Sequence, residues 1–97
     1  MRENHVLRGW RQGKQTIGGW LSIGDAFTAE TMAHIGFDWL CIDMQHGLLD
    51  YQDVKVMLPA ISTTQTIPFV RVPWNEPAEI MKALDAGAYG VIVPLIN

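Results

Sequence analysis

The segment "FDWLCIDMQHGLLD", residues 37–50, joins a run of apolar side chains to an aspartate, a glutamine and a histidine, and then reaches a glycine. Its first half is short and almost continuously apolar, which is typical of a strand that is buried in a parallel sheet. Asp43, Gln45 and His46 follow where this strand is expected to end. Because ligands bind at the carboxyl ends of the strands in parallel α/β folds, the segment predicts both the kind of sheet and the place of a site.

Strand and helix patterns alternate on both sides of this segment. Apolar residues at helical spacing predict helices, while short apolar runs bounded by glycine and polar residues predict strands. The expected helices cover residues 3–12, 25–36, 51–62 and 76–87, and the expected strands cover residues 16–23, 37–43, 67–72 and 89–96. This order from about residue 16 onward predicts an α/β fold of about four parallel strands with right-handed crossovers, preceded by a short N-terminal helix.

Four βα units in tandem fit either a small open sheet or half of an eight-stranded (β/α)8 barrel. The last expected strand ends in "VIVPLIN", residues 91–97, and no helix follows it. One side of that strand would then be uncovered. We therefore expect residues 1–97 to form one truncated domain, in which the inner face of the strands is exposed.

The bulk composition narrows the class of protein. Hydrophobic residues make up 48% of the 97-residue chain, which is enough for a sizeable core. The net charge is −3 and the seven Lys and Arg residues are scattered, which argues against a nucleic acid partner. No apolar run approaches the roughly 20 residues that span a bilayer. The single cysteine, Cys41, lies in an apolar run and suits a reducing compartment, so we expect a cytoplasmic protein.

Polar side chains gather at the predicted carboxyl ends of the strands. Asp43 ends one strand, His46 follows three residues later, and Arg71 ends the next strand along the chain. A carboxylate can orient a histidine, and a guanidinium can hold a carboxylate or a developing oxyanion. Together these residue types indicate proton transfer next to a carbonyl group.

Each of these residues also has a purely structural interpretation. Asp43 is equally well placed to cap the turn that follows the strand. His46 alone would more often be a hydrogen-bonded loop histidine, and Arg71 would serve equally well in a structural salt bridge. The other notable side chains are expected on the surface or in the core. His5 and His34 are predicted to be surface or packing residues, and Met32, Met57, Met81, Trp20, Trp39 and Trp74 are predicted core residues.

Two long stretches carry a family resemblance. "GGWLSIGDAFTAETMAHIGFDWLCIDMQHGLLDYQD" (residues 18–53) and "VRVPWNEPAEIMKALDAGAYGVIVPLIN" (residues 70–97) resemble the metal-dependent, class II pyruvate aldolases. This group includes 4-hydroxy-2-oxoheptanedioate and 2-dehydro-3-deoxyglucarate aldolases. The most specific parts are the Asp-x-x-His motif at residues 43–46, "VRVPWN" at residues 70–75 and "LDAGAYGVIVP" at residues 84–94.

The resemblance implies a fold, a reaction and roles for named residues. It implies a (β/α)8 barrel of roughly 250 residues, of which this chain would be the N-terminal half. The implied reaction is cleavage of a 4-hydroxy-2-oxo acid to pyruvate and an aldehyde. By position, His46 is the acid-base group, Asp43 supports it and Arg71 stabilises the charge on the substrate oxygen. Trp20 matches a tryptophan that shapes the aldehyde pocket.

The resemblance also implies what the chain lacks. Gln45 stands where many relatives have a glutamate, which removes a charge close to the site. The family uses a divalent metal ion such as Mg²⁺, Mn²⁺ or Co²⁺, whose ligands are expected beyond Asn97. The isolated chain is therefore expected to bind no metal specifically and to be inactive. A small oxo-acid substrate and a homo-oligomer are the expected partners, with no nucleic acid and no membrane.

Two other functions remain open at this point. One is a lyase of the same superfamily that cleaves coenzyme A thioesters. The other is a non-catalytic half-barrel that persists by association with a second copy.

Overall fold

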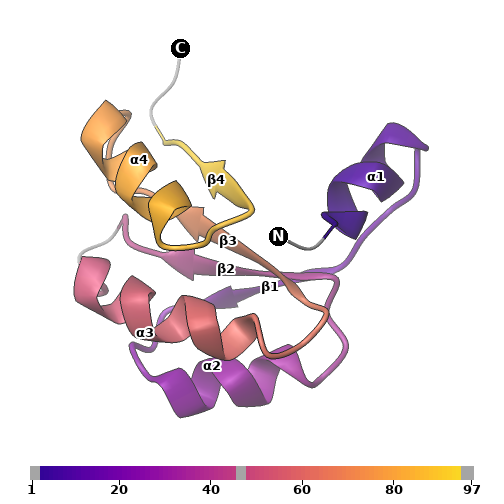
Figure 1. Ribbon diagram of the computed structural model, residues 1–97, viewed down its shortest axis with the longest axis horizontal. Coiled ribbons are helices and arrows are strands. Elements are labelled where there is room, and N and C mark those ends of the chain that lie inside the picture. The colour runs from indigo at the N-terminus through magenta and orange to yellow at the C-terminus, as the bar shows by residue number, and fades with distance from the viewer. Residues whose placement is uncertain (1–2, 46–47, 95–97) are drawn as a thin grey trace.

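The structure is a computed structural model that describes residues 3–45 and 48–94 (Figure 1). Within these residues, four helices and four strands alternate in the predicted order. They are α1 (His5–Arg11), β1 (Gly18–Leu21), α2 (Ala26–Ala33), β2 (Trp39–Asp43), α3 (Tyr51–Ile61), β3 (Ile67–Arg71), α4 (Pro77–Asp85) and β4 (Gly90–Ile92). The predicted α/β class and the order of its elements are confirmed. None of the helices within the described residues has the length and apolar character needed to span a bilayer.

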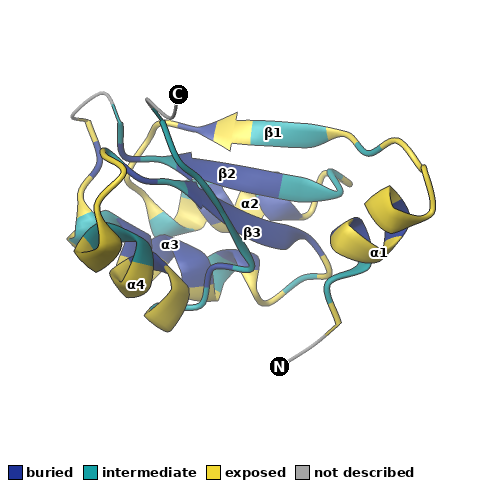
Figure 2. Ribbon diagram, turned by 90° about the horizontal axis from the view of Figure 1, so that it is seen from above, coloured by how far each residue is buried: buried dark blue, intermediate teal, exposed yellow. Residues whose placement is uncertain are grey.

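The strands form one parallel sheet in the order β1-β2-β3-β4, so every strand pairs with its neighbour in sequence. Helices α2, α3 and α4 all cover the same face of this sheet, whereas α1 lies at the end where the strands begin (Figure 2). This one-sided winding differs from an open doubly wound sheet, which carries helices on both faces. It is the arrangement that four consecutive units of a (β/α)8 barrel produce.

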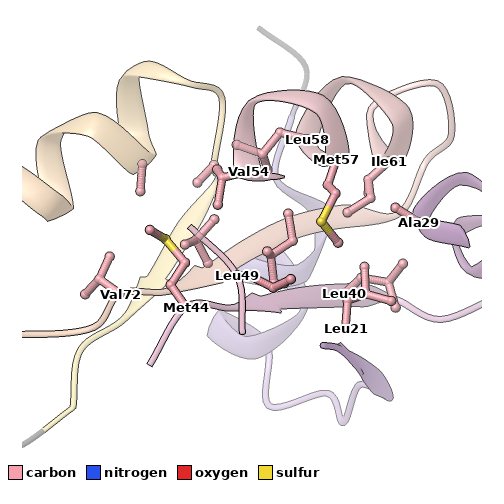
Figure 3. Close-up of a cluster of buried hydrophobic side chains, with 14 of the residues drawn as sticks. Leu21, Ala29, Leu40, Met44, Leu49, Val54, Met57, Leu58, Ile61 and Val72 are labelled. Carbon is pink, nitrogen blue, oxygen red and sulfur yellow. The ribbon is translucent and has the colours of Figure 1, made fainter. Parts of the chain in front are cut away.

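The main core lies between the sheet and the three helices (Figure 3). Alternate strand residues point toward the helices because side chains along a strand alternate between its two faces. Leu40 and Ile42 of β2 and Val70 of β3 therefore meet the apolar side of α3. The predicted buried side of α3 is confirmed at Val54, Met57, Leu58 and Ile61.

The opposite face of the sheet carries a second, smaller cluster. Cys41, Ile67 and Phe69 are buried there together with Val6 of α1. The expectation that this face would be exposed is wrong for these strand residues, because α1 and neighbouring aromatic rings cover them. The Trp39 ring stacks on Phe69, with 5.3 Å between the ring centroids.

Gly18 of β1 makes room for one of these rings. A Cβ atom at this position would lie 2.0 Å from the Trp39 indole. Glycines inside a strand indicate a close approach by other backbone or by a ligand. The approaching group at Gly18 is instead an aromatic side chain from the neighbouring strand.

Helix boundaries follow local signals. Asp25 caps α2 by accepting a hydrogen bond from the Thr28 amide, and Asp50 caps α3 in a capping box with Asp53. Three helices are followed by a glycine with positive φ, which is the usual signal for a helix stop. These glycines are Gly13, Gly36 and Gly87, with φ of 75°, 117° and 116°.

Four side chains or segments depart from the sequence-based expectations. A proline inside a helix, such as Pro59, predicts a kink or an early end, yet α3 continues to Ile61. Proline removes a single backbone donor, and the buried Leu58 and Ile61 hold the last turn against the sheet. Met81 was expected in the core but is 61% exposed, because α4 packs through Ile80 and Ala83.

Trp20 and Trp74 are also outside the core, being 43% and 62% exposed. Trp20 lies near the carboxyl end of β1, and Trp74 lies in the turn after β3. Their exposure follows from this location at the open end of the strands.

Candidate active site

Three of the predicted site residues lie at the carboxyl ends of adjacent strands. Asp43 is the last residue of β2 and pairs in register with Arg71, the last residue of β3. Trp20 of β1 pairs with Cys41, two residues before Asp43. Paired residues point to the same side of a sheet, and so do residues two apart on one strand. Trp20, Asp43 and Arg71 therefore share the face that α2, α3 and α4 do not cover.

Asp43 and Arg71 form a bidentate ion pair. Arg71 Nε donates to Asp43 Oδ1 over 3.0 Å, and Arg71 Nη2 donates to Oδ2 over 2.8 Å. The two side chains are only 10% and 23% exposed, respectively. Parallel hydrogen bonds of this kind fix the plane of the guanidinium as well as its position. The pair is thus a rigid unit rather than a loose surface contact.

Two further donors complete the hydrogen bonding of the Asp43 carboxylate. The Trp20 indole Nε1 donates to Oδ2 over 2.8 Å, and the Gln45 backbone amide donates to Oδ1 over 2.9 Å. The second bond is an Asx turn, in which an aspartate caps the backbone two residues later. A carboxylate has about four acceptor positions. Arg71, Trp20 and Gln45 together occupy all four.

The electrostatics of Asp43 follow from these contacts. Burial by itself would raise the pKa of the Asp43 carboxyl, but hydrogen bonds from Arg71, Trp20 and Gln45, together with the Arg71 charge, lower it to about 2. Asp43 is therefore ionised at neutral pH and has little tendency to take up a proton. Its geometry suits it to hold Arg71 rather than to exchange protons.

The ion pair leaves part of Arg71 available. Its Nη1 group has no acceptor within residues 3–45 and 48–94. The Trp20 ring lies beneath the guanidinium, with 5.2 Å between Arg71 Cζ and the ring centroid. Arg71, the last residue of β3, thus keeps one edge of N–H donors that can bind an anionic oxygen.

The contacts expected from the structural interpretations of Asp43 and Arg71 are present, whereas the functional roles of the two residues stay predictions. Asp43 caps the turn at Gln45, and Arg71 is in a salt bridge. His46, the predicted acid-base group, lies outside the described residues. His5 and His34 are each within hydrogen-bond distance of a backbone carbonyl, at 2.8 Å in both cases, as expected for surface or packing residues.

The sequence predicted a turn cap by Asp43, but it did not predict the hydrogen bonds that Asp43 accepts from Trp20 and Arg71. Trp20 was assigned to a pocket wall, and the salt bridge considered for Arg71 had no named partner. The spacing from Asp43 to Gln45 is the spacing of an Asx turn, so this contact had a local signal. The indole contact had none, because it joins residues 23 positions apart.

The described residues do not form a metal site by themselves. Within residues 3–45 and 48–94, no group of three or more His, Cys, Asp or Glu side chains is arranged to hold a metal ion. The Asp43 oxygens are in addition fully engaged by hydrogen-bond donors. The location of metal ligands beyond Asn97 stays a prediction.

Comparison with known proteins places this geometry in a family. A family model described as HpcH/HpaI aldolase/citrate lyase matches residues 16–97. The chain belongs to this family. The match includes all three strands that carry the Trp20, Asp43 and Arg71 cluster, and it confirms the resemblance to pyruvate aldolases.

Individual relatives of the HpcH/HpaI family agree with this assignment. The chain is 44% identical to a hydroxypyruvate/pyruvate aldolase of Rhizorhabdus wittichii, over 97% of this chain and 38% of that protein. It is 37% identical to a 4-hydroxy-2-oxo-heptane-1,7-dioate aldolase of Escherichia coli, over 98% of this chain and 36% of that protein. The chain thus spans little more than a third of the length of these relatives.

A solved structure confirms the fold. An HpcH/HpaI aldolase/citrate lyase family protein from Burkholderia cenocepacia J2315 superposes with a TM-score of 0.88 at 43% sequence identity. The superposition covers 97% of this chain and 38% of that one. The three βα units and the fourth strand described above therefore correspond to the N-terminal part of a (β/α)8 barrel in this family.

Proposed function

We propose that this sequence supplies part of the active site of an aldolase that cleaves a 4-hydroxy-2-oxo acid to pyruvate and an aldehyde, and that catalyses the reverse condensation. The observation that carries the proposal is the bidentate Asp43–Arg71 pair at the carboxyl ends of β2 and β3. The names of the relatives support the same reaction class. The enzyme in question is a chain of the relatives' length that contains this sequence.

The reaction requires an acceptor for negative charge. A base removes the proton of the 4-hydroxyl group, the bond between C3 and C4 breaks, and the aldehyde leaves. The electron pair of that bond moves into the 2-oxo group and gives the enolate of pyruvate, which is then protonated at C3. The free Nη1 edge of Arg71 is suited to stabilise the enolate oxygen or the neighbouring carboxylate, because Asp43 holds the guanidinium in a fixed plane.

We assign the proton transfers to His46 on the basis of the family motif. In an enzyme of the relatives' length, His46→Ala is expected to lower turnover by on the order of 10²-fold or more, as for the loss of a general acid-base group. His34→Ala is the matched control, because His34 is an exposed histidine that contacts the Glu30 carbonyl. Unchanged pyruvate release after His46→Ala would remove His46 from the mechanism.

The substrate class is tested by comparing two activities. An aldolase releases pyruvate from a 4-hydroxy-2-oxo acid, whereas a lyase of the citrate lyase type would consume an acyl-CoA thioester. We expect pyruvate release, and we expect Arg71→Lys to reduce it because a lysine cannot form the bidentate pair with Asp43. Consumption of acyl-CoA without pyruvate release would favour the second activity.

Dependence on a divalent ion is a further part of the proposal, and it rests on the class II resemblance. We place the ligands for Mg²⁺, Mn²⁺ or Co²⁺ outside residues 1–97. Calorimetric titration of the 97-residue chain with Mn²⁺ in the presence of pyruvate is then expected to show no stoichiometric binding. A Kd tighter than about 10 μM, which corresponds to about −7 kcal/mol, would show that this chain supplies the ligands itself.

We also propose that the enzyme is a cytoplasmic homo-oligomer. The single buried cysteine is compatible with a reducing compartment. Light scattering on a chain of the relatives' length tests the oligomer, and a monomer would contradict it.

A further inference from the structure

We propose that Trp20 is a positioning residue, whose indole N–H and ring face together hold the Asp43–Arg71 pair in the orientation in which Arg71 presents its free edge. The catalytic consequence of this role rests on the proposed aldolase function, whereas the positioning itself does not. A side chain that only forms an apolar pocket wall would need neither contact.

The indole N–H acts on the Asp43 carboxylate. Trp20 Nε1 and Arg71 Nη2 donate to the same oxygen, Oδ2, each over 2.8 Å. The other oxygen, Oδ1, accepts from Arg71 Nε and from the Gln45 amide. Each oxygen thus receives one bond from Arg71 and one bond from another element. Rotation of the carboxylate would break both of the bonds from outside the pair, so Trp20 and Gln45 fix its plane.

The ring face acts on the guanidinium. Arg71 Cζ lies 5.2 Å from the centroid of the Trp20 ring, within the range of a cation-π contact. One face of the guanidinium is therefore covered by the ring, and one edge is occupied by Asp43. These two contacts restrict the remaining donors to the Nη1 side.

A second tryptophan, Trp39, packs against the Trp20 ring. Trp39 meets it edge to face, with 6.5 Å between the ring centroids and an interplanar angle of 75°. Trp39 in turn stacks on Phe69 and donates its indole N–H to Thr16 Oγ1 over 3.2 Å. The row of aromatic side chains thus connects the site to the buried cluster under α1. This support explains how a tryptophan that is nearly half exposed can keep one orientation.

The proposal can be tested on the 97-residue chain without any activity. The chain contains four tryptophans, so its ¹⁵N-labelled indole N–H groups give four NMR signals. On acidification, the Trp20 signal is expected to shift with the same midpoint as the Asp43 carboxyl, which has a pKa of about 2. Trp74, which is exposed and has no indole hydrogen bond within the described residues, is the internal control and should not follow that midpoint.

Two variants separate the two contacts. Trp20→Phe keeps an aromatic face but removes the N–H, so it is expected to raise the Asp43 midpoint by roughly one pH unit. Trp20→Leu also removes the ring face, and it is expected to increase the exchange rate of the Arg71 Nε proton by about tenfold relative to Trp20→Phe. Trp74→Phe is the matched control and should change neither quantity.

The outcomes that overturn the proposal are distinct from failure of the aldolase assignment. A Trp20 indole signal that ignores Asp43 in the unmodified chain would show that the hydrogen bond is absent, even if the variants fail to fold. An Asp43 midpoint that is the same in Trp20→Phe and the unmodified chain would reduce Trp20 to a pocket wall. Loss of kcat in Trp20→Phe, in an enzyme of the relatives' length, would extend the positioning role to catalysis.

Discussion

Replacement of Asp43 by asparagine is the sharpest test of the site as the structure presents it. The carboxylate accepts four hydrogen bonds, two of them from Arg71. An amide has a single oxygen and adds two donors of its own. In Asp43→Asn, the amide NH₂ would face N–H donors, and Arg71 would keep its charge without a counter-ion at a position that is only 23% exposed. We expect a loss of stability that depends on pH.

The magnitude follows from the lowered pKa. Asp43 titrates at about 2 in the folded chain, compared with an ordinary value of 3.8. This difference corresponds to about 2 kcal/mol of stability. Because the folded-state pKa is the lower one, the unfolded chain binds the proton first on acidification. The contribution is therefore complete at pH values above 3.8 and is lost as the pH falls through 2.

Urea denaturation followed by tryptophan fluorescence measures this contribution. At pH 6, Asp43→Asn is expected to unfold with a free energy at least about 2 kcal/mol lower than that of the unmodified chain. The difference between the two chains should shrink between pH 4 and pH 2. Asp85→Asn is the control, because Asp85 is exposed and its carboxylate has no hydrogen bond or ion pair within the described residues. Equal free energies at pH 6, or a difference that does not change with pH, would refute the reasoning.

Three further predictions concern the frame around the site. Gly18→Ala places a methyl group against the Trp39 ring and should lower the free energy of unfolding by about 1 to 3 kcal/mol in urea denaturation. A smaller loss of stability when Gly18→Ala is made in a Trp39→Leu background would identify the clash as the cause. Thr66→Val removes a buried hydroxyl that lies within hydrogen-bond distance of two backbone carbonyls, so it should lower the free energy of unfolding by about 1 to 2 kcal/mol. Thr66→Ser keeps the hydroxyl and should retain most of the stability, so equal losses of stability in the two variants would argue against the hydrogen bonds. Burial and, to a smaller extent, the charge of Asp43 raise the pKa of the Cys41 thiol to about 12. A thiol reagent at pH 8 should therefore react with Cys41 only after urea is added, and rapid reaction of the folded chain would contradict the burial of the thiol.

Local signals were sufficient for most of the secondary structure. The predicted segment 51–62 became α3 because Asp50 caps it and its apolar residues recur at helical spacing. Both signals involve residues within a few positions of each other, so they can be read without knowing the fold. The same holds for Gly36 and Gly87, which follow α2 and α4 with positive φ.

The exposure of individual side chains was less predictable. Met81 follows the helical spacing of α4, but it is exposed because the helix turns a neighbouring side toward the sheet. The predicted exposure of the inner face of the strands is wrong at Cys41 and Phe69, which are buried. Their burial depends on α1, which is far from both in sequence and covers the end at which the strands begin (Figure 2).

The sequence by itself determined that the chain is an α/β domain with polar residues at the carboxyl ends of its strands. Alternating helix and strand periodicities and local caps carry this information, and the order of motifs carries the family. Only the tertiary structure decided which polar atoms meet. The contacts of Asp43 with Trp20 and Arg71 join residues 23 and 28 positions apart, and they depend on the register of β1, β2 and β3. A shift of one residue in that register would turn each side chain to the other face of the sheet. No short stretch of sequence specifies strand pairing. Strand pairing therefore decides which side chains lie together in the site.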